Sequence, residues 1–126
     1  MLGGRIKSYL PAIVWAVLIL TVSSIPDLST PGLGFTMTDK IVHFAEYFIL
    51  GLLTAKTVST FNKEPLKIFW LSSALTSGFG ILDELHQLLI PGRTTEGLDM
   101  VADILGSILA AGLFVRLLQR HSPGVH

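Results

Sequence analysis

Four long apolar blocks constrain the fold of this chain more than any other feature of its sequence. They cover residues 9–25, 40–58, 66–90 and 97–118. An α-helix needs about 20 apolar residues to cross roughly 30 Å of hydrocarbon, and each block is close to that length. None alternates between apolar and polar residues, as a transmembrane strand would. The blocks predict an all-α fold, a membrane bundle of four transmembrane helices forming one domain over residues 1–126.

Composition agrees with a membrane location. Half of the residues are hydrophobic, 14% are charged and the mean hydropathy is +0.64, whereas soluble domains carry roughly 25% charged residues. The net charge is zero, so the chain has no overall basic field to attract nucleic acid. It has no cysteine, which excludes disulfides and thiolate metal sites. We therefore expect the lipid bilayer to be a partner, and nucleic acid not to be one.

The basic residues predict an orientation. With the N-terminus inside, two of them, Lys40 and Arg93, fall on the outer side. The other seven fall on the cytoplasmic side: Arg5, Lys7, Lys56, Lys63, Lys67, Arg116 and Arg120. This asymmetry places both termini in the cytoplasm. The first block could instead be a cleaved signal peptide, but it is slightly longer than the usual apolar region of 7–15 residues, and we expect it to stay.

Acidic residues show the opposite distribution. Among the nine, only Glu64 falls in the cytoplasmic loop. The others fall on the outer side or in the outer halves of helices: Asp27, Asp39, Glu46, Asp83, Glu84, Glu96, Asp99 and Asp103. A charge deep in the bilayer costs on the order of 2.5–3.5 kcal/mol by insertion scales. Several retained charges predict a site at the outer face.

The second block carries a polar stripe. Asp39, His43 and Glu46 are four and three residues apart, a spacing that puts side chains on one helical face. Tyr47 follows directly and extends the stripe. The alternative is structural: Asp39 caps the helix and Tyr47 lies in an interfacial aromatic belt.

The third block places Glu84 and Gln87 on one face, with Asp83 beside them. Two adjacent carboxylates are not both ionised cheaply in a low dielectric, so a cation compensates them or one is protonated. Arg93 follows a Pro-Gly turn, and its guanidinium suits a carboxylate or a phosphate. The alternative is a buried ion-pair network that only locks the bundle.

On the fourth block, Asp99 and Asp103 form a further stripe. Asp99 near the helix start gains from the helix dipole, whereas Asp103 lies a turn deeper. We expect the catalytic groups, if the site is catalytic, to be Glu84, Asp83 and His43, acting as general acid and base. The predicted substrate-binding residues are Arg93, Gln87, Asp39, Glu46, Tyr47, Asp99 and Asp103.

A divalent cation is an open alternative as cofactor. His43 with Glu46, and Asp83 with His86, each pair an imidazole with a carboxylate three residues away, as metal sites in helix bundles do. The residue order differs between the two pairs, and no His-Glu-x-x-His motif is present. A hard cation held by carboxylates fits these residues better than zinc does.

The order of these motifs resembles the VanZ-like family of bacterial membrane proteins, over about residues 10–115. The matching motifs are Asp39-Lys40, His43-Phe44, Glu46-Tyr47, Asp83-Glu84, Gln87, Pro91-Gly92-Arg93, Asp99 and Asp103. The resemblance implies a multi-pass protein of the bacterial cytoplasmic membrane. It also implies a link to resistance against teicoplanin-type glycopeptides, which target lipid-linked cell-wall precursors, but no established reaction. The family commonly has Asn where this chain has Asp103, a change that favours proton or cation binding there.

Three functions follow as hypotheses. In the first, the protein binds or acts on a lipid-linked or phosphorylated envelope substrate, or an anionic headgroup, at the outer leaflet. In the second, it is a structural or interaction protein whose charged cluster is an ion-pair lock. In the third, it is part of a proton- or cation-coupled transporter, which would require an oligomer because four short helices make a thin path.

Overall fold

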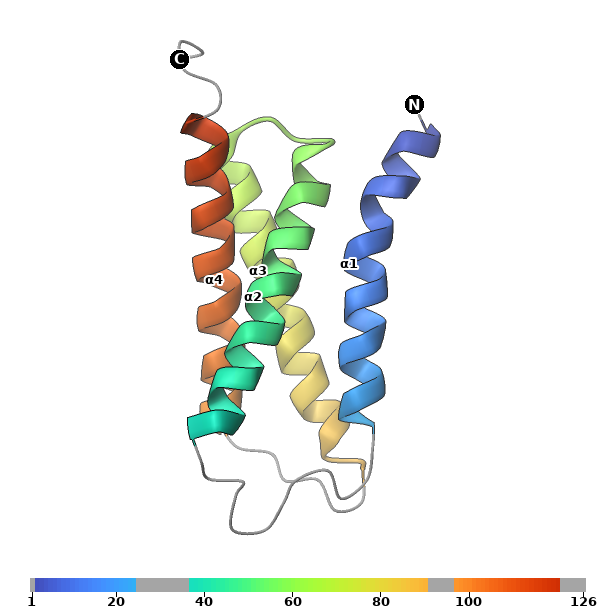
Figure 1. The fold of residues 1–126 in the computed structure, drawn as a ribbon, viewed down its shortest axis with the longest axis vertical. Helices are drawn as coiled ribbons and strands as arrows, with labels where there is room; N and C mark the ends of the chain where they lie inside the picture. Colours follow the sequence, from blue (N-terminus) through green and yellow to red (C-terminus); the bar gives the residue numbers. More distant parts are fainter. Residues whose placement is uncertain (1, 25–36, 91–96, 121–126) are drawn as a thin grey trace.

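The computed structural model describes residues 2–24, 37–90 and 97–120, shown in Figure 1. These residues form four helices and no strand, so the all-α prediction is confirmed for them. In chain order the helices are α1 Leu2–Ser23, α2 Met37–Ser59, α3 Pro65–Gln87 and α4 Gly97–Arg120.

Helices α1 and α3 differ from their predicted bounds for identifiable reasons. Helix α1 begins at Leu2, whereas the predicted helix began at residue 9. The prediction followed apolar residues only, and the residues before Tyr9 include Arg5, Lys7 and Ser8. Helix α3 ends at Gln87, although the apolar run continues to Ile90. The amides of residues 88–90 bond to carbonyls three residues back, which tightens the helix end. Ile90 also precedes a proline, a position that disfavours helical backbone.

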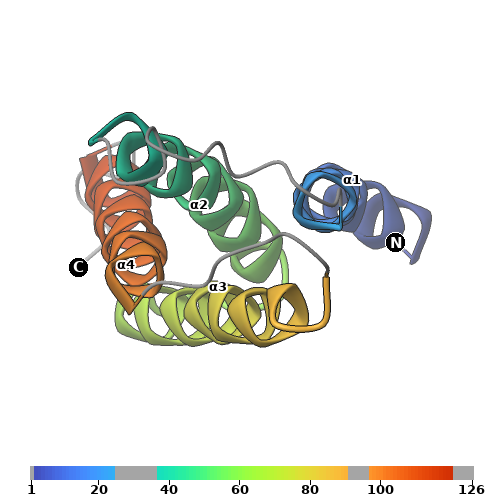
Figure 2. The same ribbon diagram turned by 90° about the horizontal axis from the view of Figure 1, so that it is seen from below.

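The helices alternate in direction along one long axis (Figure 1). The start of α1, the end of α4 and the connection between α2 and α3 lie together at one end of the bundle, which we call the basic end. The opposite end holds the end of α1, the start of α2, the end of α3 and the start of α4; we call it the polar end. Seen along the axis, α2, α3 and α4 surround a common interior and α1 stands to one side (Figure 2). Within the described residues, α1 contacts α2 and α3 but not α4.

Two glycines allow α2 and α4 to pack closely. A Cβ atom at Gly106 would lie 2.6 Å from the carbonyl oxygen of Phe44, and one at Gly51 would lie 2.7 Å from Cβ of Ala110. Small residues at helix contacts are typical of membrane bundles, where packing rather than the hydrophobic effect holds helices together. This close approach positions the polar side chains of the two helices against each other.

The polarity of the molecule is inverted relative to a soluble protein. Among the described residues, eleven buried side chains are polar or charged and eight are hydrophobic. Large apolar side chains are exposed on all four helices, for example Val17, Ile41, Leu82 and Leu109. Soluble proteins rarely expose apolar surface so extensively. Hydrocarbon is the solvent that suits this exterior.

Two helices meet the requirements for a membrane span in length and composition. They are α2 from Lys40 to Ser59, with a mean hydropathy of 1.4, and α4, with 1.9. Only 33% and 28% of these spans is buried inside the protein, whereas the core helix of a soluble protein is mostly buried. The apolar part of α1 is shorter, Lys7–Ser23, and α3 carries several polar residues. The predicted spans of α1 and α3 stay predictions.

Candidate functional site

Polar side chains from three helices meet inside the polar end. We call them the acidic cluster: His43 and Tyr47 on α2, Asp83 and Glu84 on α3, and Asp99 and Asp103 on α4. Each is at most 8% exposed. The sequence-based prediction named all six, and the structure brings them together.

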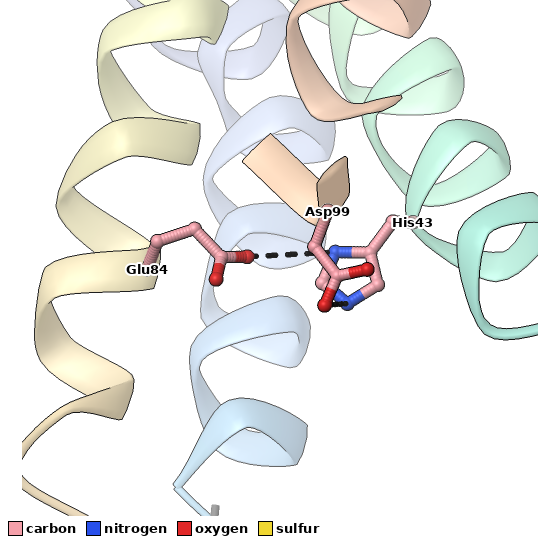
Figure 3. Close-up of side chains that lie close together, drawn as sticks. All are labelled: His43, Glu84 and Asp99. Carbon is pink, nitrogen blue, oxygen red and sulfur yellow. Dashed lines mark ion pairs between the residues drawn. The ribbon is translucent and has the colours of Figure 1, made fainter. Parts of the chain in front are cut away.

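His43 lies at the centre of the acidic cluster. Its Nδ1 is 2.9 Å from Oδ1 of Asp103 and 3.6 Å from Oε1 of Glu84, and its Nε2 is 3.8 Å from Oδ2 of Asp99. Figure 3 shows the ring held between Glu84 and Asp99. A neutral His43 can donate its Nδ1 proton to Asp103, and a protonated His43 can pair with all three carboxylates. One imidazole therefore links α2 to both α3 and α4.

Lys40 supplies a second positive charge at this end. Its Nζ is 2.7 Å from Oδ1 of Asp99. Lys40 was expected on the outer side and in the Asp39-Lys40 motif, but its pairing with Asp99 was not predicted. The available signal was its position three residues before His43, which places both side chains on one face of α2.

Tyr47 and Asp83 form the inner edge of the acidic cluster. The Tyr47 hydroxyl donates a hydrogen bond of 2.9 Å to Oδ2 of Asp83. Tyr47 is fully buried, so its alternative placement in an interfacial aromatic belt is wrong. A Cβ at Gly80 would lie 3.1 Å from Cβ of Asp103 and 3.2 Å from Cε1 of Tyr47. Glycine at this position thus lets α3 pack directly against the cluster.

Two other predicted residues contact α1. Gln87 donates a hydrogen bond of 3.3 Å from Nε2 to Oγ of Ser23. The backbone carbonyl of Glu46 accepts a hydrogen bond of 2.9 Å from Nε1 of Trp15. These bonds tie α1 to α2 and α3, a role that the spacing of residues within single helices did not reveal.

The side chains of two predicted site residues are not described by the structure. Arg93 falls between α3 and α4, in residues 91–96. Asp39 belongs to α2, but its side chain is not among those described. Their predicted roles, as a ligand for phosphate and as a helix cap or site residue, stay predictions.

The acidic cluster contains a donor set of the kind that holds metal ions. One ligand atom from each of His43, Glu84 and Asp99 lies within 4.8 Å of the other two. This donor set differs from the two pairs expected from spacing, which were His43 with Glu46 and Asp83 with His86. The half-buried His86 instead lies with its Nε2 2.9 Å from Oγ of Ser24. The grouping crosses three helices, which spacing within one helix does not predict.

The cluster combines an imidazole oriented by a carboxylate with further buried carboxylates. Such groups can transfer protons, bind a cation or hold helices together. The inverted polarity, the two candidate spans and this buried cluster define a helical membrane protein.

The chain belongs to the VanZ/LLP1 family, whose family model matches residues 6–119. The predicted resemblance is thereby confirmed over nearly the whole chain. No curated protein and no solved structure gave a significant match.

Proposed function

We propose that the chain is a multi-pass protein of the bacterial cytoplasmic membrane in which all four helices span the bilayer. Support comes from the exterior of α1 and α3, where large apolar side chains are exposed as they are on α2 and α4. Exposed side chains include Val14 and Leu18 on α1, and Leu75 and Leu82 on α3. Most of the hydroxyl and acidic side chains that lower the hydropathy of α3 are buried: Ser72, Ser73, Thr76, Asp83 and Glu84. A helix whose polar residues face the protein can still face lipid on its other side.

The charge distribution supports a cytoplasmic basic end. The basic residues described at this end on α2, α3, α4 and the α2–α3 connection are all exposed: Lys56, Lys63, Lys67, Arg116 and Arg120. Lys and Arg favour the cytoplasmic side, so both termini would be cytoplasmic. The acidic cluster would then lie near the extracytoplasmic face, at the depth of lipid headgroups.

We further propose that the acidic cluster binds or acts on a lipid-linked or phosphorylated envelope substrate, in keeping with a VanZ-like role in glycopeptide resistance. The observation that carries this proposal is His43, held 2.9 Å from Asp103 and within 4 Å of Glu84 and Asp99. A carboxylate-oriented imidazole beside a second carboxylate can exchange protons with a substrate. Four carboxylates repel a phosphate, so binding would need a cation, Arg93, or both.

Direct binding of a polyprenyl pyrophosphate tests this role. The full-length protein in nanodiscs is expected to bind the lipid, and both Glu84→Gln and Arg93→Ala should weaken binding at least tenfold. Glu64→Gln is the matched control, because Glu64 is an exposed acid at the basic end, paired with Lys67. Equal binding by the wild type, Glu84→Gln and Arg93→Ala would contradict the proposed role.

A purely structural role is the second candidate. Lys40 with Asp99, and His43 with Asp103, form short pairs between α2 and α4. Pairs of this kind can hold two helices in register without any ligand. In that case the charges contribute to the stability of the protein and not to ligand binding. Substitutions at Lys40 and Asp99 can measure both properties.

A further inference from the structure

We propose that His43, Glu84 and Asp99 form a binding site for one divalent transition-metal cation of the Zn²⁺ or Mn²⁺ type. Their ligand atoms lie within 4.8 Å of one another and come from α2, α3 and α4. Ligands about 2.0–2.2 Å from one ion are roughly 3–4 Å apart. A small inward movement of the side chains would bring the three groups to that spacing. The site does not depend on the substrate proposed above, because the metal would bind to the protein alone.

His43 is oriented as a metal ligand. Its Nδ1 lies 2.9 Å from Oδ1 of Asp103, so a Nδ1 proton would be donated to this carboxylate. The Nε2 lone pair is then available on the side of Asp99, whose Oδ2 is 3.8 Å away. The nearest Glu84 oxygen is 3.6 Å from Nδ1, so the Glu84 side chain would have to turn toward Nε2 to bind the same ion. Metal-bound histidines almost always donate their other ring N–H to a carboxylate, a carbonyl or water, which fixes the tautomer. Asp103 is therefore a positioning residue in this site.

Two buried oxygen atoms provide a second, independent observation. Oδ2 of Asp103 and Oδ1 of Asp83 have no hydrogen-bond partner among the described residues, although the two residues are 0% and 1% exposed. Asp103 contacts His43 through its other oxygen, Oδ1, so the residue that orients the proposed histidine ligand also carries an unsatisfied buried oxygen. An unsatisfied buried oxygen in a native protein often marks an ion or water that completes the site.

The charges of the acidic cluster point the same way. Four buried carboxylates, those of Asp83, Glu84, Asp99 and Asp103, lie with the basic side chains of Lys40 and His43 in the described part of the cluster. Gathering several acidic groups in a low-dielectric interior is costly. A bound divalent cation would lower the repulsion among those that are ionised.

The ligand types select the class of metal. Imidazole suits zinc, copper, iron and nickel, whereas carboxylates suit manganese, magnesium and calcium. A set with one imidazole and two carboxylates therefore fits Zn²⁺ or Mn²⁺ better than Ca²⁺. The sequence favoured a hard cation held by carboxylates, whereas the structure groups His43 with one carboxylate from each of α3 and α4.

Calorimetric titration of metal-free, full-length protein in nanodiscs with ZnCl₂ and MnCl₂ tests the site. One equivalent of at least one metal is expected to bind, and His43→Ala and Asp99→Asn should each weaken binding at least 100-fold. The matched control is His86→Ala, which removes a half-buried imidazole of the same end that lies against Ser24. A His121→Ala/His126→Ala variant excludes binding by the C-terminal tail. Binding unchanged in His43→Ala or Asp99→Asn, or absent from the wild type, would overturn the proposal.

Two further experiments remain informative if the ligand variants fail to fold. Asp103→Asn keeps all three ligands and should weaken binding about 10–100-fold, as loss of an outer-shell partner does. X-ray absorption of the wild-type zinc complex should show scattering from one imidazole. A zinc spectrum without imidazole would overturn the proposal whatever the variants do.

Discussion

At the scale of single residues, His43 and Lys40 decide how the acids of the polar end are held. His43 lies between Asp103, Glu84 and Asp99, and Lys40 pairs with Asp99 at 2.7 Å. Both basic side chains come from one face of α2, and most of their partners lie on α4. This arrangement could either hold two helices together or bind a ligand. Measurements of unfolding free energy and of binding are needed to distinguish the two roles.

The Lys40–Asp99 pair allows that separation by a double-mutant cycle. Removing one partner of a buried pair leaves the other charge uncompensated, which costs about 3–5 kcal/mol. If the cluster is a lock, Lys40→Met combined with Asp99→Asn should destabilise the protein no more than either change alone. The coupling energy, the double loss minus the sum of the two single losses, is then in magnitude at least as large as the larger single loss, about 3 kcal/mol or more. Unfolding in mixed detergent micelles measures these free energies.

The cycle also bears on the functional reading. If the cluster is a site, the double variant should lose binding of metal or lipid even where its stability is restored. A double variant that is both stable and fully able to bind would favour the lock. Lys67 paired with Glu64, which are both well exposed, gives a matched control cycle, with a coupling energy of less than about 1 kcal/mol.

At the scale of helices, the contact of α2 with α4 sets the geometry of the site. Gly106 and Gly51 allow this contact, and it brings His43 to Asp103. Helix α1 is attached differently, through hydrogen bonds from Trp15 and to Ser23. The part of the fold that makes the site is thus α2, α3 and α4, with α1 covering one side.

Gly106→Ala is expected to disrupt this contact. The new Cβ would lie 2.6 Å from the backbone oxygen of Phe44, which does not yield as a flexible side chain would. The helices must separate, and we expect a loss of about 1–3 kcal/mol in unfolding free energy, the usual cost of overpacking. Metal binding should weaken in parallel, because His43 and Asp99 move apart.

Gly112→Ala is the control for that variant on the same helix. Its Cβ would lie 3.6 Å from the ring of Phe69, an ordinary contact, and alanine favours helix by about 1 kcal/mol over glycine. We expect the free energy of unfolding to be unchanged or slightly raised. Equal loss of stability in both variants would show that the close contact at Gly106 is not what holds α2 to α4.

The helices could be predicted from the sequence because apolar length alone indicates them, and spacing within each helix gave the polar stripes. The residues of the acidic cluster were predicted for the same reason. Their partners were not, because a pair such as Lys40 with Asp99 depends on how two helices cross. The attachment of α1 through Gln87 and Ser23 was missed for this reason too. Ends of helices were least predictable, since apolar residues such as Leu88 continue beyond the helix that they follow.

At the scale of the whole molecule, the basic and polar ends give the protein a direction across the membrane. The exposed basic residues gather at one end and the buried acids at the other. An exterior of apolar side chains separates the two ends. This polarity is the basis for proposing four spans with both termini in the cytoplasm.

Labelling of single cysteines tests that topology, because the chain contains no cysteine. A cysteine at Lys63, between α2 and α3, should react with a membrane-impermeant maleimide only after cells are permeabilised. A cysteine at Gly97, which is exposed at the start of α4, should react in intact cells. Reaction of both, or of the Lys63 variant alone, in intact cells would contradict the proposed orientation.

The teicoplanin susceptibility of bacteria that express matched membrane levels of three proteins tests whether the acidic cluster is a functional site on the outer face. The wild type and Glu64→Gln should raise the inhibitory concentration of teicoplanin equally, and Glu84→Gln should leave it at the level of cells without the protein. Protection by Glu84→Gln equal to that of the wild type, or no protection by the wild type, would contradict the account.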